Sequence, residues 1–288
     1  MTTFYKVNWQ EANVNYLMTA LAELRQTLLN YIKGEERRSP TEDISTTSNL
    51  QRLCDLFRLD KYERDVLLLC AGMEIDTSWA GLCAQANGDA NQGYPTFGLA
   101  LAISNHSNWS AMTPVAPLRK WRLIEVGASN TLVNAPLRID EQILHYLMGS
   151  PHLDESLISM FELLGTENIP MMVDSHRQLA QEITATWQHT PEVLPIIQLC
   201  GSNFVSKKTI AQTVCAQFGF NLYVLSIHNL PNNPHELYQL VQRWERETLL
   251  NKSIALVKCD INTSDTGQLN KIEYLIESIT NPLIIATS

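Results

Sequence analysis

The first half of the chain carries hydrophobic residues at the three- and four-residue spacing of amphipathic helices. The first such set lies between about residues 8 and 33 and consists of Leu17, Leu21, Leu24, Leu28 and Ile32. This spacing predicts one long helix. Residues 35–49 are polar, contain Pro40 and show no periodicity, so we predict a linker there.

Shorter helical patterns continue from residue 50 and are followed by extended ones. We predict helices at 50–59, 61–76, 77–87 and 96–103, the last with Pro95 at its first helical position. Residues 123–126 and the interrupted run 129–140 have the pattern of a small β-ribbon, and 141–149 is helical again. Short helices, a ribbon and a final helix are the outline of a winged-helix domain.

Residues 150–190 join the two halves of the chain. Amphipathic patterns at 154–164 and 176–186 predict two helices, and the segment 168–174 between them has no regular period. We therefore expect a helical connector in this region.

From residue 194 onward, apolar strand-like runs alternate with helical patterns. The strand-like runs are 194–200, 221–227, 253–260 and 281–288, and the helical patterns are 207–219, 235–249 and 268–279. This alternation predicts a parallel sheet built from βαβ units. We expect the last run, PLIIAT at 282–287, to form an open edge that is prone to pairing.

The turn between the first of these strands and its helix has the position of a phosphate-binding P-loop. A P-loop follows the pattern G-x-x-x-x-G-K-[ST]: backbone N–H groups and a helix N-terminus bind the phosphates, the lysine adds charge, and the hydroxyl ligates Mg²⁺. The sequence therefore predicts a P-loop fold, with a phosphate site formed by Gly201, Ser206, Lys207, Lys208 and Thr209.

The match to the P-loop pattern can be aligned in two registers. In the first, Gly201 and Lys207 fit, Ser206 replaces the second glycine, and Lys208 takes the place of the hydroxyl residue. In the second, Lys208 and Thr209 form the intact pair, and other residues occupy both glycine positions. A side chain at a loop glycine position hinders positive φ and close approach to phosphate. The sequence leaves both registers, and tight nucleotide binding, open.

An acidic residue suited to organising Mg²⁺ stands at the end of the third strand. Asp260 follows the apolar run, but Ile261 takes the position at which an active P-loop ATPase usually has a glutamate. Asp260 is a candidate catalytic and metal-binding residue, with an ordinary strand-end role as the alternative. Lys258 places a charge inside a strand that should be aliphatic. The fourth strand ends with Ala286, Thr287 and Ser288, and a polar residue at that tip could face a γ-phosphate or begin a loop.

Four sequence blocks in the first half of the chain and one in the second together indicate a family. The blocks are LDKYERDVLLLCAGMEID at 59–76, YPTFGLALAI at 94–103, LRKWRLIEV at 118–126, APLRIDEQILHYLMG at 135–149, and the strand–loop–helix at 196–218. With these blocks the chain resembles AAA-type ATPases with an added N-terminal winged-helix domain. Such ATPases accompany extracellular contractile injection systems, which are phage-tail-like particles.

The resemblance implies an ATP-driven ring that acts in particle assembly or cargo loading. It implies ATP and Mg²⁺ as cofactors, with Lys207 or Lys208 on the phosphates and Thr209 and Asp260 on the metal. It also implies a homo-oligomeric ring, and a component of the contractile particle or its cargo as partner. Because an AAA-type module needs a fifth strand and a helical lid, we expect the module here to be truncated after its fourth strand, at Ser288.

Composition and charge narrow the function classes. The 288 residues are 45% hydrophobic and 18% charged, with a formal net charge of −9. Residues 1–150 hold 13 basic and 16 acidic residues and residues 151–288 hold 8 and 14. Neither half is basic, so we do not expect phosphate-backbone binding to dominate the function. The six cysteines show no zinc-ligand spacing, and no run suits a membrane span or signal sequence. We expect a cytoplasmic protein without membrane contacts.

Together these patterns predict a multidomain α/β protein with a mostly helical N-terminal half. We expect an N-terminal helix and polar linker at 1–49, a winged-helix-like domain at 50–150, a helical connector at 151–190, and a partial AAA-type P-loop domain at 191–288. The predicted function is an AAA-type ATPase subunit. Two alternatives stay open: a non-catalytic, P-loop-derived scaffold or adaptor that docks through the winged-helix domain, and a winged-helix nucleic-acid-binding protein, suggested by Arg119, Lys120 and Arg122.

Overall fold

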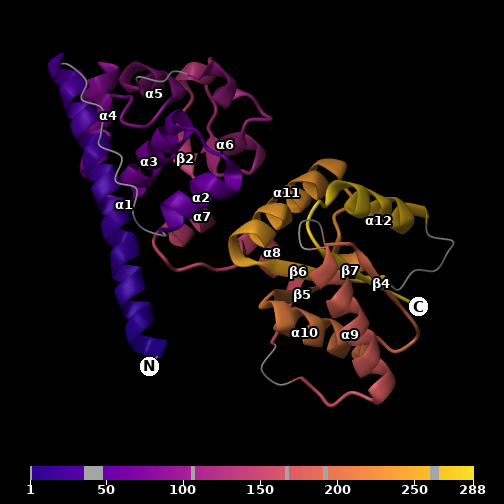
Figure 1. The fold of residues 1–288 in the computed structure, drawn as a ribbon. Helices are drawn as coiled ribbons and strands as arrows, with labels where there is room; N and C mark the ends of the chain where they lie inside the picture. The colour runs from indigo at the N-terminus through magenta and orange to yellow at the C-terminus, as the bar shows by residue number, and fades with distance from the viewer. Residues whose placement is uncertain (1, 36–47, 105–107, 166–168, 191–193, 260–265) are drawn as a thin grey trace. The chain divides into compact units, whose positions relative to one another are not determined.

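The computed structural model describes residues 2–35, 48–104, 108–165, 169–190, 194–259 and 266–288. The chain forms two compact units, Met1–His152 and Leu153–Ser288 (Figure 1). The first unit is mostly helical, and the second combines helices with a mostly parallel sheet.

The first unit consists of helices and one short β-ribbon. Its elements are α1 (Thr2–Lys33), α2 (Asn49–Phe57), α3 (Lys61–Ile75), α4 (Ser78–Asn87), α5 (Phe97–Ile103), η1 (Trp109–Met112), α6 (Pro117–Lys120), β1 (Ile124–Val126), η2 (Leu132–Asn134), β2 (Leu137–Ile139) and α7 (Glu141–Leu147). The predicted order of helices and ribbon is confirmed, and β1 pairs antiparallel with β2. Pro95 does not begin a helix, because α5 begins after Thr96, whose hydroxyl accepts the Leu99 N–H as an N-cap.

Helix α3 lies at the centre of the first unit. Its apolar run at 66–71 is almost fully buried, because α1, α4 and α5 all pack against this helix. A side chain of α1 also fixes that long helix to two others. Asn13 donates from its amide nitrogen to the Leu147 carbonyl at 2.7 Å and accepts the Asn49 backbone N–H at 2.7 Å. The long helix is therefore joined to both α2 and α7.

The second unit is a sheet with helices on both faces. Its elements are α8 (Glu155–Ile158), β3 (Phe161–Leu164), α9 (Asp174–His189), β4 (Ile197–Cys200), α10 (Phe204–Phe218), β5 (Asn221–Ser226), η3 (Ile227–Asn229), α11 (Pro234–Asn251), β6 (Ser253–Cys259), α12 (Thr266–Ser278) and β7 (Leu283–Thr287). Within the described ranges the strand order is β3-β5-β6-β7-β4. The four strands predicted from residue 194 onward run parallel, as expected, and β3 is antiparallel to β5.

Two predictions about this region are wrong. Residues 154–164 do not form one helix, because α8 ends at Ile158 and Phe161–Leu164 forms β3. The apolar positions of this segment suit either structure, and pairing with β5 decides between them. Strand β7 is not an open edge, because it lies between β6 and β4 and pairs with both.

Two hydrophobic cores lie on opposite faces of the sheet. Helices α8, α11 and α12 cover one face, where Trp244 of α11 stacks on Phe161 of β3 with 4.2 Å between ring centroids. Helices α9 and α10 cover the other face, where Trp187 of α9 is completely buried. Figure 1 shows α11 and α12 on one side of the strands and α9 and α10 on the other. The central strands are buried on both faces, as parallel strands usually are.

The carboxyl ends of the four parallel strands lie along one edge of the sheet. Strand β4 connects through α10 to β5 at the far end of this set, whereas β5, β6 and β7 follow one another in the opposite direction through helices on the other face. The chain thus reverses its direction of strand addition beside β4. Ligands of open parallel sheets bind outside the carboxyl ends of the strands at such a reversal.

Candidate phosphate-binding site

The turn between β4 and α10 lies at this edge of the sheet. It consists of Gly201, Ser202 and Asn203. Gly201 has a φ of 137°, which strains any residue with a side chain. Asn203 caps α10, since its side-chain oxygen accepts the Ser206 backbone N–H at 3.2 Å. Because of this cap the helix begins at Phe204, three residues before the start that the sequence pattern predicts, and the turn is short.

Lys207 reaches back from α10 to the ends of two strands. Its Nζ donates to the carbonyl oxygen of Gly201 at 2.7 Å and to that of Thr287 at 2.8 Å. The same Thr287 carbonyl accepts the Gly201 backbone N–H at 3.1 Å. Lys207 is only 6% exposed. The structure therefore brings together Gly201 and Lys207, the two matching residues of the first register, at the carboxyl ends of β4 and β7.

The other predicted loop residues lie in different directions around α10. Ser206 takes part in the cap through its backbone N–H, and Lys208, the residue after Lys207, is half-buried. The Thr209 hydroxyl donates to the Val205 carbonyl at 3.0 Å within the helix. Two residues along an α-helix correspond to a rotation of about 200°. Thr209 therefore lies on nearly the opposite side of α10 from Lys207, and the structure does not bring these two residues together.

The contacts further along α10 show what the Thr209 side of the helix faces. Thr213, one turn later, donates from its hydroxyl to the Thr209 carbonyl, and this hydroxyl also lies 3.8 Å from the Met172 sulfur. This side of α10 thus faces the segment before α9. An Mg²⁺ ion on phosphates held by Lys207 would need ligands on the Lys207 side of the helix. The Thr209 hydroxyl does not fit that role.

Asp260, the candidate catalytic and metal-binding residue, lies outside the described residues. The preceding strand, β6, ends at Cys259, which is the register partner of Thr287 on β7. Over the part of the chain that the structure describes, no three histidine, cysteine, aspartate or glutamate side chains are arranged to hold a metal ion.

Lys258 extends from β6 toward the start of α10. Its register partner on β7 is Ala286, whose partner on β4 is Leu199. Leu199 and Ala286 both belong to the core beneath α9 and α10. The Lys258 ammonium lies 5.2 Å from the centroid of the Phe204 ring, at the first residue of α10. In the sequence Lys258 is recognisable only as an unexpected charge, because its closeness to α10 depends on the strand order.

The side chain of Thr287 is engaged by its neighbours on β4. Its hydroxyl accepts from the Gln198 amide at 3.1 Å and lies 3.5 Å from the Cys200 sulfur, to which it donates. Thr287 thus contacts Lys207 through its carbonyl group, while its hydroxyl serves the pairing of β7 with β4.

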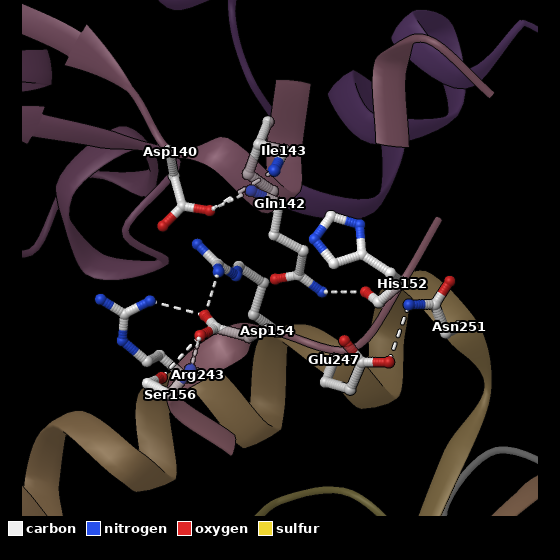
Figure 2. A network of polar contacts seen from close by, with 10 residues as sticks. Asp140, Gln142, Ile143, His152, Asp154, Ser156, Arg243, Glu247 and Asn251 are labelled. Atoms are coloured by element: carbon white, nitrogen blue, oxygen red, sulfur yellow. Dashed lines mark hydrogen bonds and ion pairs between the residues drawn. The ribbon is translucent and has the colours of Figure 1, made fainter. Parts of the chain in front are cut away.

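A second polar cluster holds α8 against α11 (Figure 2). One carboxylate oxygen of Asp154 lies 2.5 Å from Nη1 of Arg243 and 2.7 Å from Nη2 of Arg246. The other oxygen accepts the backbone N–H and the hydroxyl of Ser156. Burial by itself raises the pKa of Asp154, but the Ser156 hydrogen bond and the two guanidinium charges outweigh it and bring the pKa below its ordinary value. This cluster is a structural ion pair inside the second unit.

The basic residues that suggest nucleic-acid binding make contacts within the first unit. Arg119 donates to the Met112 carbonyl at 2.6 Å, and the Lys120 ammonium lies 4.6 Å from the centroid of the Trp121 ring. Arg138 pairs with a glutamate of α3 at 3.0 Å. Phosphate-backbone binding depends on clustered cations that face the nucleic acid, so this arrangement does not favour it.

Comparison with known proteins identifies the class of the first unit. A family model described as a winged helix domain, variant, matches residues 8–161, more than half of the 288-residue chain. The chain therefore belongs to this family of winged-helix-domain proteins. A search of curated proteins finds no match. The family match confirms the winged-helix part of the expected resemblance and does not extend to an AAA-type ATPase or a contractile injection system.

Within the described ranges, the helices of both units are too short or too polar to be membrane spans.

Proposed function

We propose that this winged-helix protein is a subunit of a ring-forming AAA-type ATPase that assembles, or loads cargo into, a phage-tail-like contractile injection particle. Its second unit binds the phosphates of ATP at the turn between β4 and α10. The link to a contractile particle rests on the sequence blocks between residues 59 and 149. The observation that carries nucleotide binding is the buried Lys207, whose ammonium lies at the carboxyl ends of two adjacent parallel strands.

The groups around the turn suit an anionic ligand. The first N–H groups of a helix have no partner inside the helix, and Asn203 takes up the one that belongs to Ser206. The N–H groups of Phe204 and Val205 precede it in the same turn and point out of the helix start. A lysine ammonium has three donors, and two of those of Lys207 go to the Gly201 and Thr287 carbonyls. The third donor and the helix dipole attract a phosphate oxygen.

Titration of the chain with a fluorescent ATP analogue tests nucleotide binding. We expect saturable binding that Lys207→Met weakens at least about tenfold, since a hydrogen bond to a charged group contributes about 1.5–3 kcal/mol. Lys208→Met is the matched control and should change the affinity less than about twofold, with circular dichroism confirming that both variants fold. A folded wild-type chain without saturable binding would refute the proposal. A larger loss in Lys208→Met would instead favour the second register.

A second candidate function is a P-loop-derived scaffold that binds nucleotide without turnover. The observation that favours it is the Thr209 hydroxyl, which bonds to the Val205 carbonyl on the side of α10 away from Lys207. Magnesium-assisted phosphoryl transfer needs a metal that bridges the phosphates, and Thr209 does not reach that position. Phosphate release by the chain, measured with excess ATP and Mg²⁺, separates the candidates. Sustained release that Lys207→Met abolishes would exclude the scaffold, whereas binding without release would favour it.

A further inference from the structure

We infer that Lys258 provides a second positive charge at the proposed phosphate site, so that nucleotide binds there without a divalent cation. This inference rests on the proposed binding of nucleotide phosphates by Lys207. In P-loop proteins Mg²⁺ neutralises much of the phosphate charge. Here the Lys258 ammonium neutralises phosphate charge in place of Mg²⁺.

The position of Lys258 follows from the register of the sheet. Register partners on neighbouring parallel strands project to the same face, so Lys258, Ala286 and Leu199 form a row that faces α10. Ala286 has the smallest side chain of the row and stands between the other two. Because Ala286 carries only a methyl group, the long Lys258 side chain has room to extend across β7 toward α10. The ammonium can thus reach the Phe204 ring, 5.2 Å from its centroid.

The contact with Phe204 brings this charge to the first turn of α10, which follows the turn of the proposed phosphate site. Phe204 is the first residue of α10 and directly follows the N-cap Asn203. Lys207, from the same helix, bonds to the carbonyl groups of Gly201 and Thr287. Two cations from different elements, α10 and β6, therefore lie beside the start of one 15-residue helix.

The chemistry of the turn favours a metal-free phosphate ligand. In the register that the structure brings together, the position that ligates Mg²⁺ in a P-loop holds Lys208, and Thr209 lies on the other side of α10. The lysines at 207 and 258 supply two positive charges, and the helix N-terminus adds about half a charge.

The test compares nucleotide binding with and without a divalent cation. The full chain is titrated with a fluorescent ATP analogue in Mg²⁺ and, separately, in EDTA. We expect the two affinities to agree within about threefold. Lys258→Met keeps a long side chain over Phe204 but removes the charge. It should weaken binding in EDTA about tenfold, as loss of a charged contact does, while added Mg²⁺ restores part of the affinity. Lys258→Arg should bind like the wild type.

A matched control removes a cation elsewhere in the same unit. Lys252 is exposed and immediately precedes β6, at the amino edge of the sheet. Lys252→Met should change the affinity in EDTA less than about twofold, because solvent and salt screen distant surface charges. Circular dichroism and thermal melts establish that each variant is folded.

The outcomes separate this inference from the proposed function. Wild-type binding that is present in Mg²⁺ and lost in EDTA overturns the inference and leaves the proposed function standing. Absence of binding in both conditions overturns the proposed function and the inference with it. Equal affinities of Lys258→Met and wild type in EDTA also overturn the inference. The wild-type comparison decides even if Lys258→Met does not fold.

Discussion

The buried ion cluster of Asp154 leads to a quantitative prediction about the second unit. The Asp154 side chain is 5% exposed and that of Arg246 is not exposed at all. The substitution Asp154→Asn keeps the size of the side chain and an oxygen that can accept from Ser156. It removes the negative charge beside two buried or half-buried guanidinium groups, one from Arg243 and one from Arg246.

The magnitude follows from the burial of the pair. Removing one partner of a buried ion pair costs about 3–5 kcal/mol, and the amide retains some hydrogen bonding, so we expect about 3 kcal/mol. The pair Asp174–Arg177 has a similar separation, 3.0 Å, but its side chains are 96% and 55% exposed. Exposed pairs of this kind contribute about 0–1 kcal/mol. Asp174→Asn is therefore the matched control.

The assay must report on the second unit, because the chain folds as two units. Urea unfolding combined with hydrogen exchange of peptides from α11 gives the free energy of unfolding at that place. We expect Asp154→Asn to lower it by about 3 kcal/mol and Asp174→Asn by less than about 0.5 kcal/mol. Equal effects of the two substitutions would refute the assignment of Asp154 as a buried counter-charge.

The same substitution should show a defined pH dependence. The pKa of Asp154 is lowered in the folded protein, so the ionised carboxylate stabilises the fold at every pH above the ordinary range of the group, near pH 4. As the pH falls through the folded pKa, the carboxylate takes up a proton and this stabilisation is lost. The difference between wild type and Asp154→Asn should thus be largest near neutrality and shrink below about pH 4. A difference that grows on acidification would contradict the ion-pair explanation.

Three further predictions concern the packing of the chain. Cys200 is exposed and the other five cysteines are buried, and burial raises the pKa of Cys215 to about 12. A thiol reagent should therefore modify one cysteine quickly in the folded chain. Rapid modification of several cysteines would contradict this burial. Trp244→Ala should destabilise the second unit by about 3–5 kcal/mol in urea unfolding, as loss of a fully buried aromatic does, and a loss below about 1 kcal/mol would count against its central place. Gly219→Ala should lower the stability of the fold by about 1 kcal/mol, because Gly219 has a φ of 68° at the end of α10. Gly165→Ala, at a position with no neighbouring atoms, should be nearly neutral. Equal melting temperatures of the two variants would show that the helix end does not need this backbone conformation.

Local patterns account for most of the helices and strands, but not for pairings between distant segments. The leucine spacing of α1 and the continuous apolar run of β6 predict these elements correctly. The segment Phe161–Leu164 is only four residues long, and its spacing also fits the end of a helix. Its strand conformation depends on hydrogen bonds to β5, far along the chain. The internal place of β7 likewise depends on the strand order.

The residues of the candidate site can be predicted from the sequence, but the register in which they match the P-loop pattern cannot. Gly201 and Lys207 are recognisable from the strand–loop–helix pattern. The choice between Lys207 and Lys208 depends on where α10 begins and on the carbonyl of Thr287, which comes from the last strand. An asparagine three residues before Ser206 is an ordinary N-cap signal, and it indicates a helix start at Phe204. The approach of a β6 side chain to this helix has no local signal.

The pairing of β4 with β7 bears on how the second unit is built during synthesis. Among the strands that the structure describes, β4 has β7 as its single neighbour, and the partners Cys200 and Thr287 are 87 positions apart. Contacts between such distant positions form slowly, because a long loop must close first. While the ribosome extends the chain, β5 and β6 can join each other early, whereas β4 must wait for β7. Lys207 bonds to the Thr287 carbonyl, so the turn between β4 and α10 reaches its observed shape only once β7 has joined the sheet.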